Sequence, residues 1–84
     1  MEWTVVLVGP AQKSLERVPA GDRTRILAAL SEMQRDPFQG DIRKLQGLSG
    51  FRRRVGNWRV FFEIALERRQ VVVTAIVRRT STTY

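Results

Sequence analysis

The sequence predicts an α+β domain in which two helices precede an antiparallel sheet, in the order β-α-α-β-β-β. Three observations support this prediction. Apolar residues in the first half recur at helical spacing, those in the second half alternate with a period of two, and Gly56-Asn57 supplies a two-residue hairpin turn. We expect one domain over residues 1–84, with both helices packed on one face of the sheet.

The first strand and first helix follow each other closely. Residues 3–8 are rich in β-branched side chains and stop at Gly9-Pro10, which predicts a strand followed by a helix that has proline in its first turn. An apolar stripe then follows at spacings of four and three: Ala11, Leu15 and Val18.

A second, longer helix is predicted over residues 21–34. Its expected apolar face consists of Ile26, Leu27, Leu30 and Met33. Asp36-Pro37 should end this helix, because the residue before a proline disfavours helical backbone angles. Residues 38–49 are of mixed composition with glycine at positions 40 and 47, and they are interpreted as a loop.

The second half predicts a three-stranded meander, with a final strand over residues 71–77. The Gly56-Asn57 turn sets Val55 opposite Trp58 and Arg54 opposite Arg59. One face of the hairpin then carries an apolar set: Phe51, Val55, Trp58, Val60, Phe62 and Ile64. The other face carries Arg52, Arg54, Arg59, Phe61 and Glu63.

Positive charge is concentrated in the second half. The first 42 residues contain five basic and six acidic side chains, whereas the last 42 contain ten basic and two acidic ones. Such segregation attracts polyanions, and a nucleic acid is the first partner to consider. The chain has neither cysteine nor histidine, so we expect no metal, no cofactor and no Ser-His or Cys-His catalysis.

Arg54 and Arg59 are the strongest candidates for a functional role. Two arginines directly opposite each other repel, so their pairing favours a phosphate ligand over an ordinary solvated surface. Phe61 is either a base-stacking ring or plain apolar surface. Arg53 is the unusual residue, because the alternation points it toward the core. Its charge then reaches solvent past the end of the sheet, or the strand is bulged there.

The chain resembles the RelE/ParE superfamily of bacterial type II toxins, in the order of its elements throughout and in the sequence of its second half. The stretches that carry the resemblance are Lys44-Leu45-Gln46-Gly47-Leu48, Arg52 to Ile64, and Val71-Val72-Val73 with Ile76-Val77-Arg78-Arg79 and Tyr84. The resemblance implies a RelE-like microbial RNase fold and a RelE-like mRNA interferase, a metal-independent endoribonuclease that acts in the ribosomal A site. In such toxins the ribose 2′-OH attacks the adjacent phosphate.

The resemblance also implies roles for individual residues. Arg52 and Arg54 match basic catalytic positions, Arg59 matches the arginine that clamps the scissile phosphate, and Arg79 would stabilise the transition state. Tyr84 matches a C-terminal tyrosine that stacks on a base or transfers a proton. We expect further RNA contacts from Lys44, Arg53, Phe61 and Arg78.

Two departures from the pattern affect the mechanism. Arginine stands where some relatives have lysine and is a poor general base, so Arg54 is interpreted as an electrostatic group. Residues 80–83 are Thr-Ser-Thr-Thr instead of a more charged segment. The alternatives are a ParE-like toxin that binds and poisons DNA gyrase without cleaving RNA, and a non-catalytic RNA-binding module.

The expected partners follow from the toxin interpretation. They are a RelB-like acidic antitoxin, mRNA in the A site, and the ribosome with its rRNA. The apolar start of the chain is too short for a membrane span and lacks the features of a signal peptide, so we expect no membrane partner and a cytoplasmic location.

Overall fold

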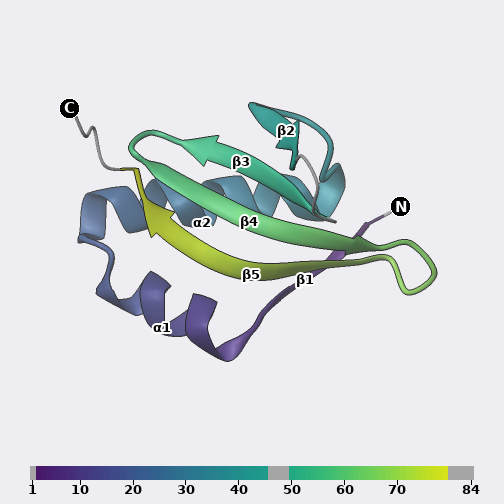
Figure 1. The fold of residues 1–84 in the computed structure, drawn as a ribbon, viewed down its shortest axis with the longest axis horizontal. Coiled ribbons are helices and arrows are strands. Elements are labelled where there is room, and N and C mark those ends of the chain that lie inside the picture. Colours follow the sequence, from purple (N-terminus) through teal and green to yellow (C-terminus); the bar gives the residue numbers. More distant parts are fainter. Residues whose placement is uncertain (1, 46–49, 80–84) are drawn as a thin grey trace.

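A computed structural model describes residues 2–45 and 50–79 of the chain. Two helices cover one face of a five-stranded sheet (Figure 1). In chain order the elements are β1 (Thr4–Leu7), α1 (Gly9–Arg17), α2 (Ala20–Arg35), β2 (Ile42–Lys44), β3 (Phe51–Val55), β4 (Trp58–Ala65) and β5 (Gln70–Arg78). The predicted fold class is confirmed, with two refinements to the sheet.

The sheet is mixed rather than wholly antiparallel. Its strand order is β1-β5-β4-β3-β2, and β1 pairs with β5 in parallel, whereas the other pairs are antiparallel. The additional strand is β2, which lies in the segment 38–49 that the sequence predicted to be a loop. β2 extends the meander by one edge strand and thereby brings two basic residues, Arg43 and Lys44, to the sheet edge.

Prolines end both helices. The backbone of Val18, before Pro19, and of Asp36, before Pro37, is extended at the helix C-terminus. The carboxylate of Asp36 then accepts a hydrogen bond from the Phe38 N–H (3.0 Å), which turns the chain toward β2. The sequence-based prediction of the end of α2 is therefore confirmed.

The core lies between the helices and the helix-facing side of the sheet. Ile26, Leu30 and Met33 of α2 are buried, whereas Leu27 is 49% exposed. The prediction that Leu27 belongs to the apolar face is wrong, because Ala29 takes the remaining place in the stripe and turns Leu27 toward water. The core cluster also includes Ala11, Val18, Val60, Phe62, Val71, Val73 and Ile76.

The β3–β4 hairpin has the predicted register. Val55 pairs with Trp58, Arg54 with Arg59, Arg53 with Val60, and Arg52 with Phe61. Of the two turn residues, only Gly56 has a positive φ (+57°), which is the φ pattern of a type II′ turn with glycine first. The face of the hairpin that points away from the core therefore carries the predicted basic residues.

Candidate functional site

The sheet face opposite the helices carries four arginines in two neighbouring rows. Arg43 on β2 pairs with Arg52 on β3, which pairs with Phe61 on β4, so these three side chains share one row. Arg54 and Arg59 form the next row. Neighbouring strands lie about 4.8 Å apart and same-face residues along a strand about 7 Å apart, so several guanidinium groups can reach one ligand. We call these five residues the basic face.

No carboxylate forms an ion pair with an arginine of the basic face within the part of the chain that the structure describes. Among those residues the one ion pair joins Arg53 to Glu32 on the other side of the sheet. Glu63 shares the outward face but occupies the next row, opposite Val72. Arg43 and Arg54 are exposed, and Arg52 and Arg59 are partly covered. The geometry therefore offers planar donor groups, held on rigid strands, to an anionic ligand such as a phosphate.

Arg79 lies at the same end of the sheet as the Arg54–Arg59 pair. Its backbone N–H donates a hydrogen bond of 2.6 Å to the carbonyl of Asn57, which ties the residue after β5 to the hairpin turn. The structure thus brings together Arg54, Arg59 and the backbone of Arg79. Tyr84, the remaining predicted catalytic residue, lies outside the described residues.

Arg78 occupies a position on the helix-facing side. It pairs with Trp58, whose indole Nε1 donates a hydrogen bond of 3.0 Å to Asp22 of α2. Because register partners share a face of the sheet, the exposed Arg78 belongs to the rim of the hairpin turn and not to the basic face.

Lys44, a predicted RNA contact, and its neighbour Arg43 lie on opposite faces of β2. Lys44 pairs with Phe51, whose ring stacks on Phe62 in the core at 5.6 Å between centroids. Lys44 therefore belongs to the helix-facing side of the edge strand, and Arg43 takes the outward position. Sequence reasoning missed Arg43 because its segment was interpreted as a loop. The three residues Ile42-Arg43-Lys44 are too short a run to show the alternation that predicts a strand.

Arg53 lies on the helix-facing side of the sheet, away from the basic face, so its placement does not support the predicted RNA contact. It is 7% exposed and is the one buried charged residue in the described part of the chain. Its guanidinium points at α2, where it pairs with Glu32 and donates to the Ala29 carbonyl at 3.4 Å. The inward direction that the alternation predicts is confirmed. Both expected explanations are wrong, because the side chain is 9% exposed and does not reach solvent past the sheet end, and the β3–β4 ladder is regular at this position.

Phe61 lies beside Arg52 on the basic face and is partly exposed. The pairing of β4 with β5 is irregular immediately after Phe61, where Thr74 is an extra residue in β5. The Thr74 hydroxyl donates a hydrogen bond of 3.3 Å to the Phe61 carbonyl. This bulge bends the sheet next to the ring. An aromatic ring flanked by arginines has the chemistry of a base-stacking platform.

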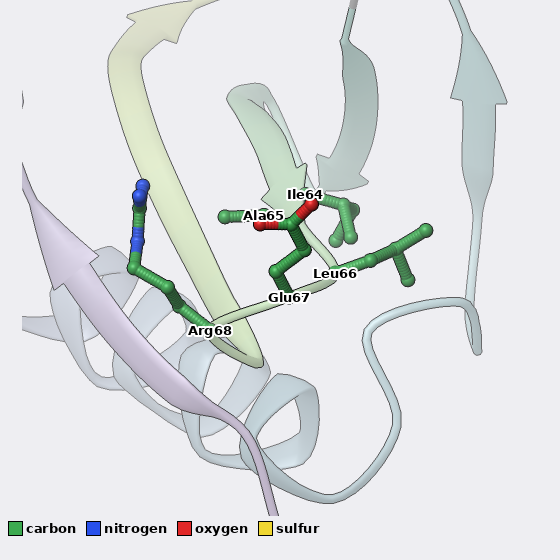
Figure 2. A pocket seen from close by; sticks show the side chains of 5 residues that line it. All are labelled: Ile64, Ala65, Leu66, Glu67 and Arg68. Atoms are coloured by element: carbon green, nitrogen blue, oxygen red, sulfur yellow. The ribbon is translucent and has the colours of Figure 1, made fainter.

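The remaining surface features lie elsewhere. A hollow at the β4–β5 turn is lined by Ile64, Ala65, Leu66, Glu67 and Arg68, and it includes none of the predicted site residues (Figure 2). Within residues 2–45 and 50–79, no three histidine, cysteine, aspartate or glutamate side chains gather where they could hold a metal ion. None of the helices described has the length and apolar character needed to cross a bilayer.

Comparison with known proteins gives matches in structure alone. No family model and no curated protein matches the sequence. A RelBE toxin–antitoxin complex from Mycobacterium tuberculosis contains a chain with a TM-score of 0.85 and 21% identity, matched over 94% of this chain and 100% of that one. A RelB–RelE complex from Methanococcus jannaschii matches with a TM-score of 0.75 and 26% identity, over 88% of this chain and 89% of that one.

A third similar structure is a YoeB/ParE toxin from Agrobacterium tumefaciens. Its TM-score is 0.78 at 18% identity, and the match covers 92% of this chain and 99% of that one. These structures share the order of two helices and a mixed sheet described above. The resemblance suggested by the basic hairpin is confirmed at the level of architecture, and the chain has the fold of the RelE/ParE toxin superfamily.

Proposed function

We propose that this protein is the toxin of a type II toxin–antitoxin system and that it cleaves mRNA on the ribosome. The observation that carries the proposal is the basic face: four arginines in two adjacent rows, with no carboxylate partner among the described residues. The fold shared with RelE toxins supports the same reading. Like charges held across a hairpin destabilise it, which favours a functional origin for the arrangement.

The proposed reaction is an intramolecular transesterification, in which the phosphorus exchanges its bond to the 5′ oxygen of the next nucleotide for a bond to the 2′ oxygen of the ribose that already carries it. The 2′-OH attacks the adjacent phosphorus and the bond to the 5′ oxygen breaks, which leaves a cyclic phosphate and a free 5′-OH. Negative charge grows on the phosphate oxygens in the transition state, and preorganised cations stabilise it. This route uses no metal and no histidine, in keeping with a chain that has no histidine.

Each basic residue has a proposed part in this reaction. Arg59 clamps the scissile phosphate, Arg52 and Arg54 add positive potential beside it, and Arg79 contacts the phosphate oxygens in the transition state. Arginine keeps its proton, so the group that accepts the 2′-OH proton is a different one. Tyr84 is proposed to stack on a base or to donate the proton to the leaving oxygen.

An acidic antitoxin is the proposed protein partner. The Mycobacterium and Methanococcus structures are toxin–antitoxin complexes, which supports a cognate RelB-like antitoxin here. An amphipathic antitoxin segment laid on the basic face would bring carboxylates to Arg52, Arg54 and Arg59 and would keep mRNA away from them.

The proposal is tested with purified protein, ribosomes and mRNA. We expect cleavage that requires ribosomes and leaves 5′-OH ends, which a polynucleotide kinase can label directly. Binding of RNA without cleavage, by protein shown to be folded, would contradict the nuclease and leave a non-catalytic RNA-binding module.

A second candidate function is poisoning of DNA gyrase, and its support is the similarity of fold to a structure named as a YoeB/ParE toxin. A supercoiling assay with purified gyrase separates the two. Under the nuclease proposal, gyrase activity stays unchanged at toxin concentrations that abolish translation.

A further inference from the structure

Arg53 is a buried cation between two residues of the basic face. Its neighbours in β3, Arg52 and Arg54, point to the opposite side of the sheet. The Arg53 side chain is 9% exposed, whereas that of its ion-pair partner Glu32 is 61% exposed. Two groups of α2 therefore hold the guanidinium: the Glu32 carboxylate and the Ala29 carbonyl oxygen.

Gly40 closes the space around the same guanidinium. Its φ is +98°, and a Cβ atom at this position would lie 3.0 Å from both Cζ and Nη2 of Arg53. A side chain here would strain the backbone and push the guanidinium away. The loop between α2 and β2 consequently runs directly against Arg53.

These contacts link three parts of the molecule on the side of the sheet behind the basic face. Arg53 pairs with Ile42 of β2, and the backbone N–H of Arg54 donates to the Asp41 carbonyl at 2.9 Å. The guanidinium thus ties α2, the loop through Gly40 and the β2–β3 pair to one another. β2 and β3 together carry Arg43, Arg52 and Arg54 of the basic face.

Stability alone gives a weak reason for this arrangement. Removing a guanidinium from water is costly, and well-packed apolar residues often replace a buried ion pair with no loss of stability. Catalytic groups, in contrast, must be held to within about half an ångström by side chains behind them. The Arg53 guanidinium is held by Glu32, Ala29 and the loop at Gly40, and Arg53 lies between Arg52 and Arg54 in β3. This placement suits a residue that holds catalytic groups in position.

We propose that Arg53 is a positioning residue, which acts with Glu32 and Gly40 to set the placement of Arg43, Arg52 and Arg54 on the opposite side of the sheet. The inference rests on the proposed mRNA cleavage. Arg53 touches neither RNA nor the reacting atoms. It determines how closely the arginines on either side of it converge on one phosphate.

The test uses two substitutions that disturb the contact from opposite sides. Gly40→Ala displaces the guanidinium without removing a charge, and it also strains the backbone, whose φ is +98°. Arg53→Met removes the charge but keeps an unbranched side chain. The matched control is Gly21→Ala, since Gly21 lies in α2 with nothing within 4 Å of an added Cβ. Arg53→Lys, which keeps the charge but not the planar fork, is the conservative variant.

Single-turnover cleavage on saturating programmed ribosomes should fall roughly tenfold or more in Gly40→Ala and Arg53→Met, because small misplacements of catalytic groups are expensive. The ribosome concentration that gives half the maximal rate should change less than about twofold, because the contacts made by unaffected residues remain. Arg53→Lys should recover part of the rate, and Gly21→Ala should match the wild type.

The two perturbations should also be coupled. In the Arg53→Met background the space beside Gly40 is free of the guanidinium, so adding Gly40→Ala should lower the rate by much less than in the wild type. Wild-type rates in the folded Gly40→Ala and Arg53→Met proteins would overturn the proposal. So would rate losses that only track the unfolded fraction measured by circular dichroism.

A second readout keeps this inference separate from the proposed function. If the wild type cleaves no mRNA, the nuclease proposal fails, and amide chemical shifts of the ¹⁵N-labelled proteins then test the positioning. Gly40→Ala should shift the amide resonances of Arg43, Arg52 and Arg54, while Gly21→Ala leaves them in place. Unchanged resonances in Gly40→Ala would overturn the positioning role.

Discussion

Arg54 and Arg59 face each other as register partners across the β3–β4 hairpin, and neither forms an ion pair with a described carboxylate. A direct cross-strand pair of like charges is destabilising, by up to about 1 kcal/mol. This pair sits next to the turn, where Arg79 is also tied to the hairpin. The molecule thus keeps an unfavourable contact at the centre of its proposed site, and this contact leads to the first prediction.

Arg54→Gln should stabilise the isolated protein. Removing one of the two charges relieves the repulsion and should raise the free energy of unfolding by roughly 0.5 kcal/mol at low ionic strength. Urea denaturation followed by tryptophan fluorescence measures the change. The gain should shrink in high salt, where the wild-type repulsion is screened. Arg17→Gln on α1 is the control, and a loss of stability in Arg54→Gln would contradict the prediction.

The salt dependence of RNA binding should distinguish the arginines of the basic face from Arg53. For single-stranded RNA, each lost phosphate contact lowers the slope of log K against log salt by about 0.7. Arg54→Ala and Arg59→Ala should each show this decrease, whereas Arg53→Met should keep the wild-type slope. Fluorescence anisotropy with a labelled oligoribonucleotide provides the measurement. An equal decrease in Arg53→Met would place its guanidinium on the RNA after all.

The hydrogen bond from Trp58 to Asp22 should hold the hairpin turn against the start of α2. Trp58→Phe removes the donor and should cost about 1 kcal/mol of unfolding free energy. In an Asp22→Ala background the same substitution should cost clearly less, because the acceptor is already missing. Urea denaturation of the two single variants and the double variant completes the cycle. Simple additivity would show that the hydrogen bond contributes nothing.

Antitoxin binding should stabilise the toxin strongly. A ligand present at 100 times its Kd adds about 2.7 kcal/mol to the free energy of unfolding, which for a domain of this size raises the Tm by roughly 10 °C or more. The carboxylates of the antitoxin would also relieve the Arg54–Arg59 repulsion. Calorimetry of the toxin alone and with its purified antitoxin tests this. Equal melting temperatures would contradict it.

Local signals made much of the fold predictable. Each proline that follows a helix forces the preceding residue into extended backbone, so the end of α2 could be placed from Asp36-Pro37. The Gly56-Asn57 turn fixed the hairpin register and, with it, the outward position of Arg52, Arg54 and Arg59. Both signals act within a few residues of the chain.

The features that escaped prediction depend on contacts between distant segments. The parallel pairing of β1 with β5 joins opposite ends of the sequence, and β2 is defined mainly by its partner β3. The partners of Arg53 come from α2 and from Gly40, and neither has a sequence pattern that points to β3. Once β2 exists, alternation places Arg43 outward and Lys44 toward the helices, which a loop interpretation could not decide.

The most direct test of the central claim is primer extension on mRNA from a purified translation system. The reactions would contain the wild type, Arg59→Ala, Arg79→Ala or the control Arg17→Ala, each with and without ribosomes. The account predicts cleavage within codons only when ribosomes are present, lost in Arg59→Ala and Arg79→Ala and kept in Arg17→Ala. Cleavage that persists undiminished in Arg59→Ala would show that the basic face is not where the phosphate is held.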